Sequence, residues 1–200
     1  MTTSAELVDE LNGTAGRAGY AAFAAGCAAR LGPVFESFAR TGHGRYADWL
    51  AELQACIDAP ELARSRKLQG QVKAAPEASI DDSNRPDYYA MRALGVLFYA
   101  VQVLSAGDMA AAALRCARAS LALLRDFDYV LSTPAGSPGA FTGLELRAER
   151  ESLDMLKSSL SGMAGRQAMA EATTSDLYRR LQEVSGEIAL VHDWNLDQWR

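Results

Sequence analysis

The sequence predicts an all-α fold: a single domain, residues 1–200, of seven or eight helices around a buried central helical hairpin at about 87–130. Signals that begin and end helices recur along the whole chain, and strand patterns are nearly absent. Residues 93–104 are apolar on every side except at Gln102, so a helix there has to be enclosed by other helices. This run is too short for a membrane span, which needs about 20 residues. The chain is also 49% hydrophobic and 22% charged, as folded globular proteins are.

The first two helices are predicted from a cap and from a run of small residues. Thr3 and Glu6 have the spacing of a capping box, so a short helix begins there and continues to about Leu11, before a break at 12–13. Residues 15–29 are mostly Ala and Gly, and side chains this small allow a neighbouring helix to approach closely.

Three further helices are expected before the middle of the chain. Pro33 begins one of them, because proline suits the first helical turn. After a turn at 41–44, the segment 45–57 places its aromatic and aliphatic residues on one helical face. Turn residues then restart a helix at about 58–73.

The central hairpin follows the best linker of the chain. This linker is an exposed loop near 75–86, rich in Pro, Ser, Asp and Asn. The hairpin consists of a helix at about 87–104 and a long helix that continues to about Val130. Gly107 is expected to end the first helix, and Asp108 to cap the second.

The last third of the chain is predicted to hold two more helices. A second exposed loop is expected near 132–140, which is rich in Pro and Gly. Thr142 and Glu145 then have capping-box spacing for a helix to about Ser161, which assigns the Glu145 carboxylate to the cap. Acidic and basic residues alternate further along this helix, which predicts a solvated face held by i,i+4 pairs. They are Arg147, Glu149, Arg150 and Glu151. The final helix is expected at about 174–191.

The composition of the chain limits which partners and which cellular compartment we expect. A net charge of −5 and a pI of about 5.1 disfavour a nucleic-acid-binding face. The N-terminus lacks the basic and apolar regions of a signal peptide, so the cytoplasm is the expected compartment. Three cysteines lie far apart without a Cys-x-x-Cys pair, and we expect them to be free core residues. They are Cys27, Cys56 and Cys116.

The sequence contains none of the familiar catalytic motifs, and we predict no catalytic residue, no cofactor and no metal site. The two histidines, His43 and His192, are not preceded by a Glu three residues earlier, which the Glu-x-x-His spacing of di-iron bundles requires. The Gly-x-Ser-x-Gly motif of serine hydrolases and the glycine-rich phosphate loops are absent as well. The sequence therefore favours a protein that binds over one that catalyses.

Two groups of residues indicate protein binding. Trp194 and Trp199 lie in the C-terminal tail, and tryptophan is enriched at interface hot spots. The alternative is that one or both pack the tail onto the bundle. The second group consists of acidic residues in the long loop and near a helix end. They could contact a basic partner; the alternative is that they are surface residues solvated by water. The members of this group are Asp81, Asp82, Asp126 and Asp128.

A family resemblance runs nearly end to end along the chain. An aromatic residue, Cys, Arg, Pro, Phe and Thr-Gly occur in this order. They are Phe23, Cys27, Arg30, Pro33, Phe38 and Thr41-Gly42. With Asp87-Tyr88-Tyr89 before the apolar helix, this pattern resembles the YjaG-like family of bacterial all-helical proteins of unknown function. The resemblance implies a compact helical bundle and brings no catalytic residues, while the central loop and the C-terminal tryptophans depart from the family's pattern.

Size, acidic charge and missing catalytic motifs predict a non-enzymatic protein-binding module. Its sharpest form is a bacterial immunity-type inhibitor that neutralises a cognate toxin by direct binding, with a basic toxin domain as the partner and neither nucleic acid nor membrane involved. One alternative is a homo-oligomeric regulatory or structural protein, whose tail contributes to a homodimer. Another is a helical enzyme that acts on a small molecule in a pocket between helices.

Overall fold

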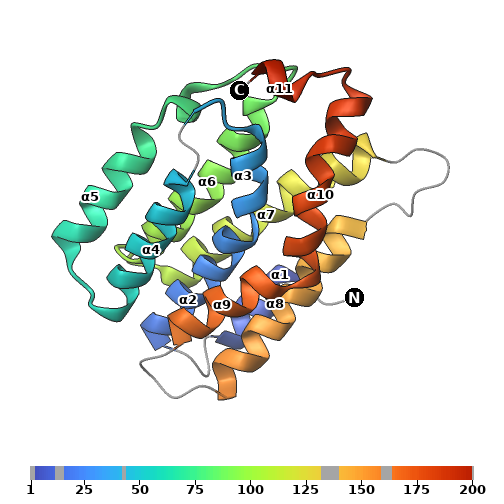
Figure 1. The fold of residues 1–200 in the computed structure, drawn as a ribbon. Coiled ribbons are helices and arrows are strands. Elements are labelled where there is room, and N and C mark those ends of the chain that lie inside the picture. Colours follow the sequence, from blue (N-terminus) through green and yellow to red (C-terminus); the bar gives the residue numbers. More distant parts are fainter. Residues whose placement is uncertain (1–2, 12–15, 42–43, 132–139, 159–163, 200) are drawn as a thin grey trace.

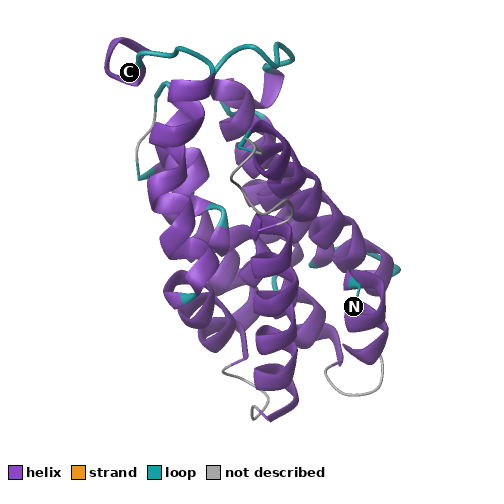
Figure 2. Cartoon of the chain, turned by 90° about the vertical axis from the view of Figure 1, so that its right-hand side faces the viewer, coloured by secondary structure: helices purple, strands orange, loops and turns teal. Residues whose placement is uncertain are grey.

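The computed structural model describes residues 3–11, 16–41, 44–131, 140–158 and 164–199, and these form a bundle of helices (Figures 1 and 2). In chain order they are α1 (Ser4–Leu11), α2 (Gly16–Arg30), α3 (Gly32–Phe38), α4 (Arg45–Asp58), α5 (Leu62–Lys73), the 3₁₀ helix η1 (Pro76–Ser79), α6 (Asp87–Val103), α7 (Met109–Val130), α8 (Ala140–Ser158), α9 (Ala164–Thr174), α10 (Asp176–Val191) and α11 (Leu196–Trp199). No strand occurs in the described ranges, so the predicted all-α fold is confirmed. The structure contains more helices than the seven or eight that the sequence predicts, mainly because α9 and the one-turn α11 are separate elements.

Two helices begin at the caps that the sequence predicts. The hydroxyl of Thr3 accepts a hydrogen bond from the N–H of Glu6 at 3.3 Å, and the Glu6 carboxylate accepts from the N–H of Thr3 at 2.8 Å. Asp108 accepts from the N–H of Ala111 at 2.9 Å and begins α7. These caps form where predicted because they involve only residues three positions apart.

The helix enclosed on all sides is α2. Every residue from Gly19 to Arg30 is buried, and α2 packs against α6, α7 and α9. The predicted hairpin of α6 and α7 packs beside it, but Phe98 and Tyr99 of α6 stay half-buried. The prediction that this stretch of α6 is enclosed all round is therefore wrong. The small side chains of α2 allow its neighbours to approach more closely, so α2 takes the centre.

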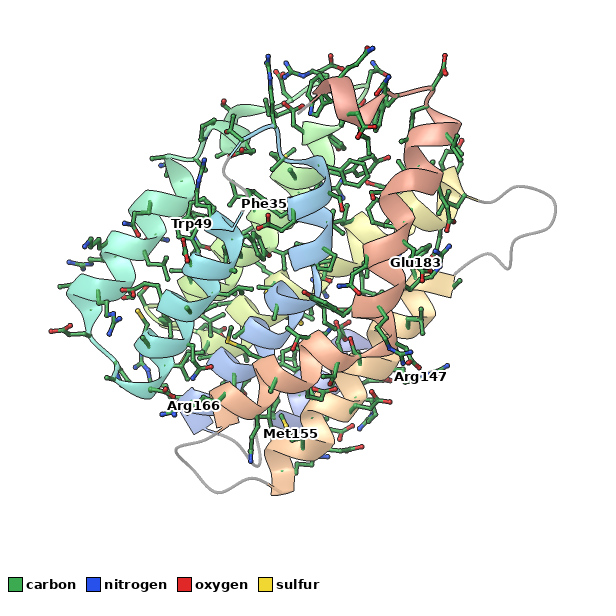
Figure 3. All side chains as sticks on the ribbon, viewed as in Figure 1. Phe35, Trp49, Arg147, Met155, Arg166 and Glu183 are labelled. Carbon is green, nitrogen blue, oxygen red and sulfur yellow. The ribbon has the colours of Figure 1, made fainter. Side chains whose placement is uncertain are left out.

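Aromatic rings fill the space between α3 and α4. The ring of Phe35 lies 5.0 Å from that of Tyr46 and 6.1 Å from that of Trp49, centroid to centroid, and Phe35 and Trp49 lie close together in Figure 3. The Tyr46 hydroxyl donates to the carbonyl oxygen of Ala28 at 2.9 Å and so connects α4 to α2. The apolar face predicted for 45–57 is thus the face that packs on the core.

The two predicted loops have different outcomes. The loop near 75–86 contains η1, and the buried Glu77 of η1 forms an ion pair with Arg45, with 3.5 Å between Nη1 and Oε2. Residues 81–84 of this loop are exposed. Most of the loop near 132–140 lies outside the described residues, as do His43 and the predicted end of a helix near Ser161. No helix in the described ranges is long and apolar enough to cross a membrane.

Candidate functional site

A buried ionic network joins α2 to α8 and α7. Arg30 and Glu145 are both 0% exposed. The Nε of Arg30 donates to Glu145 Oε2 at 2.7 Å and its Nη2 donates to Glu145 Oε1 at 3.0 Å, while the Ser120 hydroxyl donates to Oε1 at 3.0 Å. Burial alone would lower the pKa of Arg30. The charge of Glu145, its hydrogen bond and the neighbouring Cys27 and Glu149 together outweigh burial and raise this pKa, so the guanidinium stays protonated.

The capping box predicted for α8 is therefore wrong. The helix begins at Ala140, so Thr142 lies in its first turn, and Glu145 faces Arg30 instead of a backbone N–H. Asp128 of α7 supplies the cap. It accepts from the N–H groups of Phe141 and Thr142 at 2.9 and 3.0 Å and from the Thr142 hydroxyl at 2.6 Å. Asp128, predicted to bind a partner, is thus engaged in holding α7 and α8 together.

Glu149 lies one helical turn after Glu145 and is also 0% exposed, so the prediction of a solvated face is wrong at this position. The hydroxyl of Ser4, at the start of α1, donates to Glu149 Oε2 at 2.7 Å. Within the described ranges Oε1 has no hydrogen-bond partner. Burial, and next the negative charge of Glu145, raise the pKa of Glu149 to about 8. Glu149 is therefore mainly a neutral carboxylic acid at pH 7.

The network extends to α9 through Ser152. The Nη1 of Arg30 donates to Ser152 Oγ at 3.4 Å, and Ser152 donates to Glu171 Oε2 at 2.8 Å. Burial raises the pKa of Glu171, although the bond from Ser152 partly offsets this. One guanidinium thus faces three carboxyl groups, and one positive charge balances only one negative charge in a low dielectric. The network is consequently a place where the protein retains protons.

Together with Cys27, the network contains ligand types that are found at metal sites. Its Sγ and one carboxylate oxygen from each of Glu145 and Glu149 lie within 4.8 Å of one another. However, Arg30 Nη2 donates both to Cys27 Sγ at 3.4 Å and to Glu145. A hydrogen bond with Cys116, and then burial, also raise the pKa of Cys27, which disfavours the thiolate that binds metals. The donor set therefore does not fit a metal ion while Arg30 is in place.

The network also lacks the access that catalysis on a substrate requires. A general acid or base has to come within hydrogen-bond distance of the reacting group, and Arg30, Glu145 and Glu149 have no exposed surface. Its chemical role in this conformation is to fix how α1, α2, α7, α8 and α9 pack. The local sequence pattern does not reveal this network, because it predicts a cap at Glu145 and a solvated position at Glu149.

The remaining predicted binding residues gather at the end of the bundle where α7 and α10 finish. Asp81 and Asp82 are exposed in the loop before α6, and the Asp82 carboxylate accepts a local bond from the N–H of Asn84 at 3.0 Å. Asp126 lies near the end of α7, where it pairs with Arg92 of α6 at 2.6 Å and is 43% exposed. Asp81 and Asp82 are therefore free to meet a partner, whereas Asp126 already has a cation.

Both tail tryptophans pack onto this same end. The Trp194 ring stacks on His192, with 4.3 Å between centroids and 12° between planes, and lies 6.1 Å from Tyr89 of α6. The Trp199 ring lies under the guanidinium groups of Arg40 and Arg85, at 5.7 and 5.3 Å from the ring centroid. In Figure 1, α11 lies across the top of the bundle near the loop that leads into α6. The tryptophans thus hold the tail in place, as the alternative interpretation expects.

Exposed apolar side chains complete this end of the bundle. Tyr129 of α7 is 84% exposed, and Leu190 and Val191 of α10 are 83% and 52% exposed. Exposed carboxylates without an ion pair in the described ranges lie in the same region. They are Asp81, Asp82, Asp193 and Asp197. We refer to these seven residues as the acidic end.

Asp128 offers a direct test of its assignment as a cap. Replacing it with Ala removes all three hydrogen bonds to the start of α8, and we expect a loss of about 1–2 kcal/mol in the free energy of unfolding. Urea denaturation followed by circular dichroism measures it. The control is Asp126→Ala, two residues earlier, which removes only a partly exposed ion pair and should have a smaller effect. Equal losses in the two variants would contradict the assignment.

Comparisons with known proteins add no relative. A scan against protein-family models, a search of curated proteins and a search of solved structures each find no match. The resemblance to the YjaG-like family therefore stays a prediction, and the function has to be inferred from the geometry of this chain.

Proposed function

We propose that this protein is a protein-binding module of the immunity type, which neutralises a cognate toxin by covering its active surface with the acidic end. The observation that supports the proposal is the combination, at one end of the bundle, of exposed apolar side chains with unpaired carboxylates. Tyr129 and Leu190 each leave more than four fifths of their surface in water. We propose that these side chains contact the partner, because apolar surface of this kind becomes buried at interaction sites.

The charge of this end indicates a basic partner. Asp81, Asp82, Asp193 and Asp197 form no ion pair in the described ranges, and the whole chain carries a charge of −5. Unpaired carboxylates around an apolar centre speed the encounter with a cationic surface, and salt weakens this effect. A toxin that acts on nucleic acid has such a surface, because phosphate binding requires Lys and Arg.

The test compares two residues that are equally exposed at opposite ends of the bundle. Val191 at the acidic end and Leu62 at the start of α5 are both 52% exposed. The partner captured from a lysate of the native host is identified, purified and titrated against Val191→Ser and Leu62→Ser. We expect Val191→Ser to weaken binding about tenfold, equivalent to about 1.4 kcal/mol, and Leu62→Ser to leave it unchanged.

Neutralisation provides the functional half of this test. Co-expression with the partner should protect a bacterial host from the partner's toxicity, and the Val191→Ser variant should protect less. A partner that is bound equally by both variants, or that is not toxic, would contradict the proposal.

The second candidate function is a homodimer formed through the same end. It is favoured by the exposure of Leu190 and Val191 in the last turn of α10, because a symmetric interface brings the same surface of two copies together. Light scattering distinguishes the two functions. A monomer at all concentrations excludes the dimer, and a dimer that Val191→Ser dissociates would replace the inhibitor proposal.

A further inference from the structure

A cavity of about 600 Å³ lies at the other end of α6 from the acidic end, where α2 begins, α4 ends and α6 turns into α7. The 17 residues of α6 separate these two ends by about 25 Å. Ala18 and Ala21 form part of the wall, and their small side chains leave space that larger residues would fill. The volume is within the range of small-molecule sites in proteins, about 300–1,000 Å³.

Two opposite charges line this cavity without pairing with each other. The Nη2 of Arg17 donates to the carbonyl oxygen of Leu104 at 3.1 Å, which leaves its positive charge without a carboxylate in the described ranges. Glu61, in the turn between α4 and α5, forms no ion pair there either. The rest of the lining is mainly apolar, with Ile57, Leu62 and Met109 among it.

We propose that this cavity binds a small zwitterion with an apolar body, the chemical class of amino acids with large apolar side chains. The anionic group of the ligand pairs with Arg17 and its cationic group with Glu61, and its apolar body lies against Ala21 and Met109. A simple anion or a simple cation matches only one of the two charges and is repelled by the other. Because both charged side chains are exposed to water, each contributes modestly, and we expect a dissociation constant of about 1 mM.

Three probes that share an indole body separate the contributions of the two charges. Equilibrium dialysis of the full chain measures binding of L-tryptophan, which has both charges, of N-acetyl-L-tryptophan, which has only the anion, and of tryptamine, which has only the cation. We expect L-tryptophan to bind at least about fivefold more tightly than either of the others. Equal binding of all three, or no binding of L-tryptophan, overturns the proposal.

Variants locate the site. Arg17→Gln should reduce the affinity for L-tryptophan to that of tryptamine, and Glu61→Gln to that of N-acetyl-L-tryptophan. Both side chains are exposed, so neither variant threatens the fold. Ala21→Phe fills the cavity and should abolish binding, whereas Val191→Ser, at the acidic end, should not affect it. Unchanged binding in both Arg17→Gln and Glu61→Gln would place L-tryptophan elsewhere and overturn the proposal.

Cys56 gives an independent readout, since it lines this cavity and Cys27 and Cys116 do not. All three thiols are buried, so each reacts only when the structure around it opens locally. Peptide mass spectrometry after iodoacetamide treatment reports how fast each thiol reacts. L-tryptophan should slow the alkylation of Cys56 and leave the two other thiols unaffected. Because this site and the acidic end are tested with different ligands and different variants, the failure of one proposal does not decide the other.

Discussion

Replacing Arg30 with Met is expected to lower the free energy of unfolding by about 3–5 kcal/mol, the cost of removing one partner from a buried ion pair. Glu145 would keep only the hydrogen bond from Ser120, in a position with no exposed surface. Since domains of this size are stable by about 5–15 kcal/mol, the change removes a large part of the total. Urea denaturation at pH 7, followed by circular dichroism, measures it.

Two further variants separate the buried pair from the general effect of losing an arginine. Arg64→Met breaks an ion pair with Glu52 of similar length, 2.7 Å, in which both side chains are about a third exposed. We expect it to leave the stability nearly unchanged, because solvent screens such pairs. The double variant Arg30→Met with Glu145→Met should recover most of the loss, because it leaves no unpaired buried charge. A loss in Arg30→Met no larger than that in Arg64→Met would show that the network does not stabilise the bundle.

The elements that the sequence predicts correctly depend on neighbouring residues. The capping box at Thr3 and Glu6, and the cap at Asp108, involve positions three apart, so spacing alone identifies them. The hairpin of α6 and α7 is predicted from two long helical patterns joined by a short connection, because such a connection makes two consecutive helices pack antiparallel. Local signals of this kind do not require knowledge of the tertiary structure.

The buried network could not be predicted in the same way, because its partners are far apart in the sequence. Arg30 and Glu145 are separated by 115 positions, and Ser4 and Glu149 by 145. The true cap of α8, Asp128, comes from another helix. The local motif at Thr142 and Glu145 predicts a cap that these long-range partners replace.

One signal in the sequence does point to the network. Phe23, Cys27 and Arg30 follow the helical spacing i, i+4, i+7, so a helix that buries Phe23 and Cys27 also turns Arg30 inward. Glu145 and Glu149 share a face of α8 in the same way. Charged residues on an otherwise apolar stripe need partners inside the protein. Three acids with one arginine leave two carboxyl groups without a counter-charge, and burial favours their neutral forms.

Replacing Glu149 with Gln is expected to stabilise the protein at neutral pH and to flatten its dependence on pH. The pKa of Glu149 is raised to about 8 in the folded protein, against an ordinary value of 4.5. Between these two pH values the folded state retains a proton that the unfolded state has lost, so the free energy of unfolding falls as the pH rises. The glutamine has no proton to lose. We expect a gain of about 4 kcal/mol at pH 7.5 from linkage, reduced by the free energy lost if the amide accepts a weaker hydrogen bond from Ser4 than the carboxyl group does.

The pH dependence distinguishes this effect from a simple improvement in packing. The advantage of Glu149→Gln should be small at pH 5, grow as the pH rises towards 8, and change little above it. The matched control is Glu151→Gln on the exposed side of the same helix, which should follow the wild type at every pH. If the free energies of unfolding of wild type and Glu149→Gln differ by the same amount at every pH from 5 to 8, the raised pKa of Glu149 is contradicted. A widening difference would show that the proton held by Glu149 controls how the stability of the protein depends on pH.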